Sequence, residues 1–108
     1  MTTSGTETLA YRADVATDAP ERYAKQLVAH LGRKAAFVDT ETPVGPGSSL
    51  RIGTATGSVV PGDGVLVLLA SGDDADDVAR TQHVLGSRLE RFGQRAELVV
   101  TWRADASS

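Results

Sequence analysis

The stretch that decides the fold is Asp63-Gly64-Val65-Leu66-Val67-Leu68-Leu69-Ala70, followed by Ser71-Gly72-Asp73-Asp74. The Asp-Gly dipeptide favours the positive φ angles of a tight hairpin turn. Residues 65–70 are apolar on both faces. This is typical of a central strand that is covered on both sides, or of a strand whose outer face meets a second subunit. The four residues after this strand predict a turn into a helix.

That helix has a charge order that complements the helix dipole, with aspartates at its start and arginines further along. Its predicted buried stripe consists of Val78, Leu85, Leu89 and Phe92, and Gly93 ends it. The four aspartates between residues 73 and 77 do not have the spacing of a calcium-binding loop. They are therefore interpreted as residues that cap the helix and compensate its dipole.

The N-terminal part of the chain predicts a strand followed by a first helix. Residues 8–15 alternate between apolar and polar positions, which is the period of a half-buried strand. A helix is expected from about Ala19, because Asp18 can cap it and Pro20 needs no amide donor in the first turn. Gly32 is expected to end this helix.

The middle of the chain predicts three or four antiparallel strands. Residues 35–39 have the pattern of a short strand, and two prolines and two glycines favour an exposed loop over residues 42–49. Alternation resumes over residues 50–53, and the glycine-rich stretch that follows is interpreted as a hairpin turn. Gly57 and Pro61 weaken any strand there and favour an edge position.

With a last strand over residues 97–103, the element order is β-α-β-β-β-β-α-β. This order predicts an α+β fold, a two-layer sandwich in which one mostly antiparallel sheet carries both helices on one face. The 108 residues are expected to form a single domain 1–108. Its folded core is expected over residues 7–103, and residues 1–6 and 104–108 are expected to be mobile tails.

Composition excludes several classes of protein. A net charge of −3 and a hydrophobic fraction of 41% argue against a disordered acidic tail and against a basic nucleic-acid-binding arm. Without cysteine there is no disulfide, no thiolate nucleophile and no cysteine-bearing zinc site. The polar N-terminus lacks a secretory pattern, and the longest apolar run is too short to cross a bilayer. We therefore expect a cytoplasmic protein that binds neither nucleic acid nor membrane.

Polar side chains at the margins of the two helices are the candidate ligand-binding residues: Tyr23, Gln26, His30 and Arg88. His30 is either a boundary histidine bonded to a carbonyl or carboxylate, or a ligand contact. Arg88 either pairs with a carboxylate or recognises an anion. His83 is expected to be solvated. No nucleophile–base pair or metal-ligand set can be assembled, so no catalytic residue, metal or cofactor is assigned.

Three stretches together resemble a bacterial family, the domain of unknown function 2218. They are ADVATDAPERYAKQLVAH at 13–30, GSRLERF at 86–92 and ELVVTW at 97–102. The resemblance implies a compact bacterial domain that sometimes occurs beside siderophore-interacting flavin reductases, which would make such a reductase a partner. It places the first-helix pattern of the family on residues 22–30. Many members of the family look as if they carry two further histidines, at positions where this chain has Arg33 and Arg88. The resemblance therefore supports no metal site here.

Three hypotheses for function follow. The first is a non-catalytic accessory or binding domain, linked to siderophore or iron metabolism, that uses the surface around Tyr23, Gln26, His30 and Arg88. The second is a structural or interaction protein that forms a homodimer through the sheet at residues 65–70. The third is an enzyme with His30 as general base, which requires an acidic or nucleophilic neighbour within hydrogen-bond reach.

Overall fold

The computed structural model describes residues 9–32, 36–42, 44–93 and 98–104. The elements along these ranges are β1 (Leu9–Ala16), α1 (Pro20–Leu31), β2 (Val38–Thr42), β3 (Gly45–Ile52), β4 (Ala55–Pro61), β5 (Val65–Gly72), α2 (Ala75–Phe92) and β6 (Arg103–Ala104). The predicted order of strands and helices is confirmed. The expected tails at 1–6 and 105–108 lie outside the described residues. In the described ranges, neither helix is long and apolar enough to cross a membrane.

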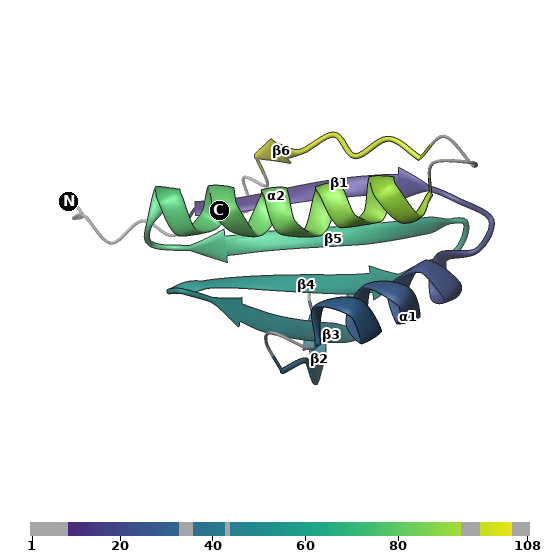
Figure 1. The fold of residues 1–108 in the computed structure, drawn as a ribbon, viewed down its shortest axis with the longest axis horizontal. Coiled ribbons are helices and arrows are strands. Elements are labelled where there is room, and N and C mark those ends of the chain that lie inside the picture. Colours follow the sequence, from purple (N-terminus) through teal and green to yellow (C-terminus); the bar gives the residue numbers. More distant parts are fainter. Residues whose placement is uncertain (1–8, 33–35, 43, 94–97, 105–108) are drawn as a thin grey trace.

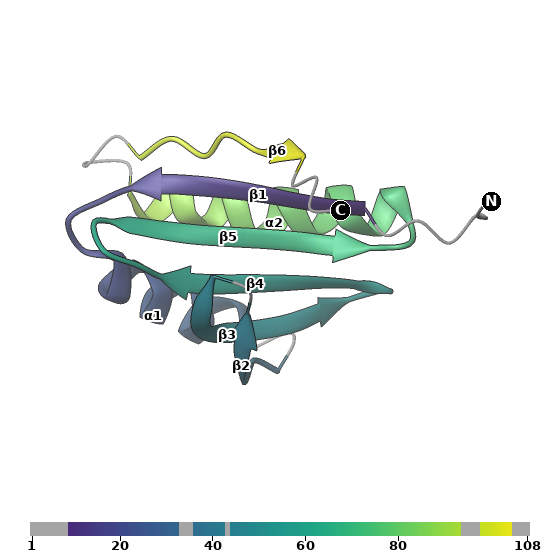
Figure 2. The ribbon, with the colours of Figure 1, turned by 180° about the vertical axis from the view of Figure 1, so that it is seen from behind.

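One sheet and one layer of helices make up the architecture. The six strands lie in the order β2-β3-β4-β5-β1-β6, and every neighbouring pair is antiparallel. Both helices lie on the near side of the sheet in Figure 1 and behind it in Figure 2, with α2 along β5 and β1 and α1 beside β4 and β3. The predicted α+β sandwich with both helices on one face is therefore confirmed.

The central position of β5 explains its unusually apolar sequence. Leu66 and Leu68 pair with Val15 and Ala13 of β1 and belong to the core beneath the helices. The intervening residues face the other side of the sheet, which Figure 2 shows without a helix. Even there, Val67 is only 5% exposed. The helix-covered face of β5 is thus removed from water, whereas on the other face Val67 is buried and Val65 and Leu69 are half-buried.

The core joins the inner faces of both helices to this side of the sheet. It contains aliphatic residues of α1, α2 and the central strands, and the largest fully buried side chains are Leu27, Leu66, Leu68, Leu85 and Leu89. Burying one such leucine contributes roughly 1.5 to 3 kcal/mol. Both amphipathic helices are therefore fixed to the sheet by their buried faces, and Val78, Leu85 and Leu89 of the stripe predicted for the second helix are buried.

The exposed loop predicted over residues 42–49 is wrong, because β3 begins at Gly45. Its first residues pair with β2, with Thr42 opposite Gly45 and Glu41 opposite Pro46. A Cβ placed on Gly47 would lie 2.5 Å from the carbonyl oxygen of Val59 on β4. The glycine at this position is therefore required by the close approach of a neighbouring strand rather than by a loop.

The edge position predicted for residues 54–61 is also wrong, since β4 pairs with β3 on one side and β5 on the other. Gly57 is buried under α2, where an added Cβ would meet the methyl group of Thr81 at 2.8 Å. Pro61 is the last residue of β4, beyond the end of the pairing with β3 at Val59. Proline has no backbone N–H to donate, but at this position its absence interrupts no hydrogen bond between β4 and β3. Of residues 53–57, which were predicted as a hairpin turn, only residues 53 and 54 lie in the turn, with Gly53 at φ 62°, and β4 begins at Ala55.

The last strand is shorter than expected. Of the predicted residues 97–103, only Arg103 is in a strand, and Ala104, expected in the tail, extends β6 opposite Tyr11. Residue 97 lies outside the described residues. The backbone N–H of Val100 donates to the Glu90 carboxylate of α2 at 3.0 Å. Val100 and Trp102 still pack against the core. The alternating apolar residues that predicted a strand are therefore packed against the core without being paired in a strand.

The two helix starts differ in how they are capped. Asp74 caps α2 as predicted, because its carboxylate accepts from the backbone N–H groups of Asp76 and Asp77 at 2.8 and 3.2 Å. Asp18 does not cap α1. The N-cap is Ala19, whose N–H donates to the hydroxyl of Thr17 at 3.1 Å. A hydroxyl two residues before the N-cap orders this turn in place of the predicted aspartate.

Candidate functional site

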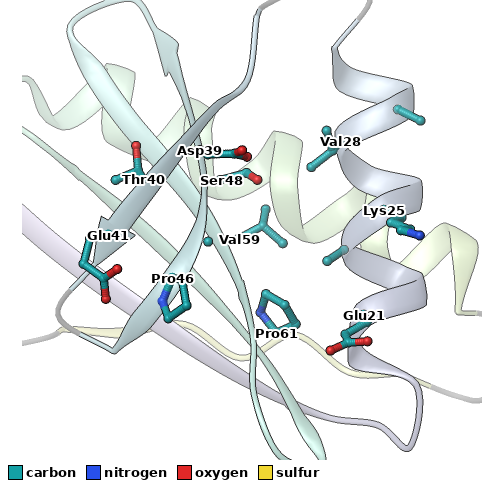
Figure 3. A pocket seen from close by; sticks show the side chains of 13 residues that line it. Glu21, Lys25, Val28, Asp39, Thr40, Glu41, Pro46, Ser48, Val59 and Pro61 are labelled. Carbon is teal, nitrogen blue, oxygen red and sulfur yellow. The ribbon is translucent and has the colours of Figure 1, made fainter.

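A cavity of about 780 Å³ lies between α1 and the strands β2, β3 and β4. Figure 3 shows the helix on one side, two strands on the other and Val59 of β4 between them. Its volume falls within the range of small-molecule binding sites, about 300 to 1,000 Å³. We call this cavity the cleft and treat it as the candidate functional site.

One face of α1 forms the first wall of the cleft. The residues that contribute are Glu21, Ala24, Lys25, Val28 and Ala29. They are spaced by one, three or four residues, so they lie on one side of the helix. The small alanines keep the helix surface low between the two charged side chains. The wall is therefore apolar in its middle and charged toward the first turn of α1.

Strand register builds the opposite wall. Asp39 of β2 pairs with Ser48 of β3, which pairs with Val59 of β4. Paired residues of neighbouring strands project from the same face of a sheet, so these three side chains form a row on the helix-covered face. In Figure 3 the polar ends of Asp39 and Ser48 point toward α1, and the carboxylate of Glu21 points toward Pro61. The cleft thus has polar walls and an apolar floor.

The charged groups that described residues contribute to the cleft are three carboxylates and one ammonium group: Glu21, Asp39, Glu41 and Lys25. Within the described ranges, none of the four forms an ion pair or a side-chain hydrogen bond. The described residues also contain no group of three or more His, Cys, Asp or Glu side chains placed to hold a metal ion. The carboxylates are therefore free to contact a ligand singly, and the excess negative charge favours a cationic one.

The structure places three of the predicted site residues on other parts of α1. Tyr23 is 7% exposed and belongs to the core, with the guanidinium of Arg22 5.6 Å from its ring centroid. Gln26 is exposed. His30 is exposed as well, and its ring meets the edge of Phe92 with centroids 5.4 Å apart at 78°. No described residue forms a hydrogen bond with His30, as a general base would require.

Arg88 is half-buried on α2 and lines a different cavity, so the cleft is lined by none of the four predicted residues. The prediction selected the flank of α1 that faces α2, where His30 contacts Phe92. The opposite flank, with Lys25 and Val28, faces the strands. A signal was present in the charged and small residues of that flank. That signal points to a cleft only when the opposite wall is known, and part of that wall, with Pro46, Gly47 and Ser48, lies in the segment that the sequence predicted as a loop.

One known protein family matches most of the chain. The family described as uncharacterized proteins conserved in bacteria, domain of unknown function 2218, matches residues 12–103. The chain belongs to this family. The match includes both helices and the described strands from Arg12 to Arg103, so both walls of the cleft lie within the domain of unknown function 2218. No curated protein matches the chain.

Two solved structures share the fold of this family member. The NMR structure of PA4090 from Pseudomonas aeruginosa has a TM-score of 0.71 and 22% identity, covering 93% of this chain and 99% of that one. A de novo designed protein with a ferredoxin fold, LFR1 1, has a TM-score of 0.52 and 14% identity, covering 93% and 86%. At these identities, both similarities establish the fold alone.

The likeness to a ferredoxin fold shows which part of the domain of unknown function 2218 forms the cleft. The ferredoxin-like arrangement is β-α-β-β-α-β. Leaving β2 and β3 out of the present order yields that arrangement, with β4 next to β5 and β1 next to β6. The additional hairpin, β2 and β3, carries Asp39, Glu41 and Ser48. The strand wall of the cleft is therefore largely the contribution of this hairpin.

Proposed function

We propose that the protein is a non-catalytic binding module that takes a small organic cation with an apolar body in the cleft between α1 and β2–β4. One observation carries this proposal: among the described residues, three carboxylates without an ion-pair or hydrogen-bond partner and one ammonium group line a cavity of ligand size with an apolar floor. The floor offers Val28 and Val59 to an apolar body, and the carboxylates at the rim offer ion pairs to an ammonium group.

Charge decides between cationic and anionic ligands of the same shape. An anion in the cleft would face Glu21, Asp39 and Glu41, and only Lys25 could pair with it. A cation of equal size would have three possible partners. Exposed ion pairs contribute about 0.2 to 1 kcal/mol each, and apolar contacts supply the remaining affinity. A modest affinity with a clear preference for cations is therefore expected.

The matched probes for this proposal are benzylamine and benzoate, which share a ring and differ in charge. Titration of the isotope-labelled full chain, followed by amide NMR shifts, should show benzylamine shifting amides of α1, β2 and β3 around the cleft. Glu21→Gln and Asp39→Asn should each weaken benzylamine binding by about 2- to 5-fold, the equivalent of one exposed ion pair. Asp63→Asn, in the turn between β4 and β5, is the matched control. Equal binding of both probes at the cleft would overturn the proposal.

The link to siderophore or iron metabolism is part of the same proposal, supported by the resemblance described above. Ferric siderophores and flavins should therefore be titrated as further candidate ligands. The proposed partner is a siderophore-interacting flavin reductase, and the proposed location is the cytoplasm. Ala substitutions at Tyr23, Gln26, His30 and Arg88 test the competing placement on the other flank of α1. Loss of siderophore binding in these variants, with the cleft variants unaffected, would favour that placement over the cleft.

A homodimer formed through the sheet is the second candidate function. The observation that favours it is the helix-free face of β5, where Val65 and Leu69 are half-exposed on either side of the buried Val67. A second copy packed on this face would bury the remaining exposed parts of these side chains. Light scattering at micromolar concentration tests the dimer directly, because a monomer has a mass of 11.3 kDa. A monomeric mass would remove this candidate.

A further inference from the structure

A second cavity, of about 430 Å³, lies where the end of α1 meets the last turns of α2. Its lining residues are Leu31, His83, Val84, Ser87, Arg88 and Arg91. Five of them come from one face of α2, since they are spaced by one, three or four residues along the helix. We call this cavity the arginine pocket. It is separate from the cleft, because the two share no lining residue.

The arginine pocket has the opposite charge character to the cleft. Among the described residues that line it, two carry guanidinium groups and none carries a carboxylate. The ion pairs of the described residues use Arg12, Arg80 and Arg103, and neither Arg88 nor Arg91 has a partner among those residues. An arginine in the last turn of a helix also complements the helix dipole, which accounts for Arg91. Arg88 lies one turn earlier and is half-buried in the cavity.

The other lining groups define what kind of anion fits. Leu31 is 6% exposed and Val84 is partly buried against the core, so the floor is apolar. The hydroxyl of Ser87 donates to the backbone carbonyl of His83, which leaves its oxygen as an acceptor only. The donors offered to an anion are thus a ring N–H of His83 and the two guanidinium groups, whose planar forks match a carboxylate.

We propose that the arginine pocket binds an organic carboxylate, with the carboxylate on Arg88 and Arg91 and an apolar group on Leu31 and Val84. This site is independent of the cleft and of its cationic ligand. Because the two cavities have opposite charge, one pair of probes separates them. Benzoate is the probe for the arginine pocket, and benzylamine is the probe for the cleft.

The test is a titration of the full chain with benzoate, followed by amide NMR shifts. Benzoate should shift amides of Leu31 and of the last two turns of α2, and benzylamine should not. Arg88→Gln and Arg91→Gln should each weaken benzoate binding by about tenfold. Arg51→Gln, which removes the same charge from an exposed arginine of β3, should leave it unchanged. The amide spectrum of each variant verifies its fold.

Benzoate shifts elsewhere in the protein, or equal weakening by Arg51→Gln, would overturn the site and indicate general electrostatic attraction. Inorganic phosphate is the second probe, and binding as tight as that of benzoate would overturn the role of the apolar floor. A failure of benzylamine at the cleft leaves these readouts unaffected, because the two probes report on different amides.

Discussion

The carboxylate of Asp77, in the first turn of α2, accepts two hydrogen bonds from Thr54, one from the backbone N–H and one from the hydroxyl, each 2.9 Å long. Thr54 lies in the turn between β3 and β4, so this contact fixes the β3–β4 turn to the start of the second helix. The backbone hydrogen bond, the hydroxyl hydrogen bond and nearby Arg80 lower the pKa of Asp77 below its ordinary value of 3.8, although desolvation opposes them.

The first prediction concerns the pH dependence of this contact. The pKa of Asp77 is lower in the folded protein than in the unfolded chain, where it has its ordinary value of 3.8. The ionised carboxylate therefore stabilises the fold at pH values above this ordinary pKa. That contribution is lost as the pH falls through the folded-state pKa. Asp77→Asn should therefore lower the free energy of unfolding in urea at pH 7. Its difference from the wild type should shrink below about pH 4.

Asp76→Asn is the matched control for Asp77→Asn. It removes one negative charge from the same helical turn, and Asp76 forms no side-chain hydrogen bond with any residue that the structure describes. A smaller loss of stability is expected for Asp76→Asn. Equal losses would show that the helix dipole, rather than the bond to Thr54, accounts for the effect of Asp77.

A second prediction tests the close packing of β4 under α2. A Cβ on Gly57 would lie 2.8 Å from Cγ2 of Thr81, 3.0 Å from Leu85 and 3.1 Å from Leu50. Gly57→Ala should therefore destabilise the fold by about 1 to 3 kcal/mol through overpacking. Thr81→Ser removes the nearest methyl group and keeps the hydroxyl bond to the carbonyl of Asp77.

Thr81→Ser alone should cost about 1 kcal/mol, since it deletes one buried methyl group. In the double variant, the methyl group added by Gly57→Ala can occupy the space that the threonine methyl leaves. The loss of stability in the double variant should then be smaller than the sum of the two single losses, as a urea-denaturation cycle measures. Additive losses would show that the added methyl group does not meet the methyl group of Thr81.

The sequence predicted the elements whose signals are local. Helix α2 was recognised because its capping aspartate and its apolar spacing lie within the segment itself. The second half of β3 was predicted over residues 50–53, but its first half was missed, because the local sequence around Pro46 and Gly47 is typical of a loop. Glycine is required at position 47 because the carbonyl oxygen of Val59, on the neighbouring strand, would lie only 2.5 Å from a Cβ atom there. Such a reason is tertiary and leaves no local pattern.

The candidate site was out of reach for the same reason. The cleft depends on the register that aligns Asp39 with Ser48 and Val59, and this register crosses three strands. With residues 42–49 assigned to a loop, the sequence did not reveal a wall opposite Lys25 and Val28, and the histidine directed the prediction to the flank of α1 that faces α2. Arg88 was selected correctly as a residue at a helix margin, but the cavity it lines was visible only once the ends of α1 and α2 were placed together.

A third prediction concerns His30, whose ring meets Phe92 edge-on at 5.4 Å. If this contact holds the ends of the two helices together, His30→Ala and Phe92→Leu should be coupled by about 0.5 to 1 kcal/mol in a double-variant cycle. His83→Ala, an exposed histidine of α2, is the control and should not couple to Phe92→Leu. A coupling near zero for His30 would remove its structural role and leave ligand contact as the remaining explanation.

The fourth prediction uses the single tryptophan of the chain as a reporter. A Cβ on Gly86 of α2 would lie 3.2 Å from the indole nitrogen of Trp102 and 3.3 Å from Val100. Gly86→Leu should therefore push residues 98–102 away from the helix and expose the indole to water. Tryptophan emission should shift to longer wavelength, and Gly86→Ala should shift it less because its methyl group requires only a small displacement. Ala79→Leu, an exposed position of the same helix, is the control. Unchanged emission in Gly86→Leu would mean that the C-terminal segment does not rest on Gly86.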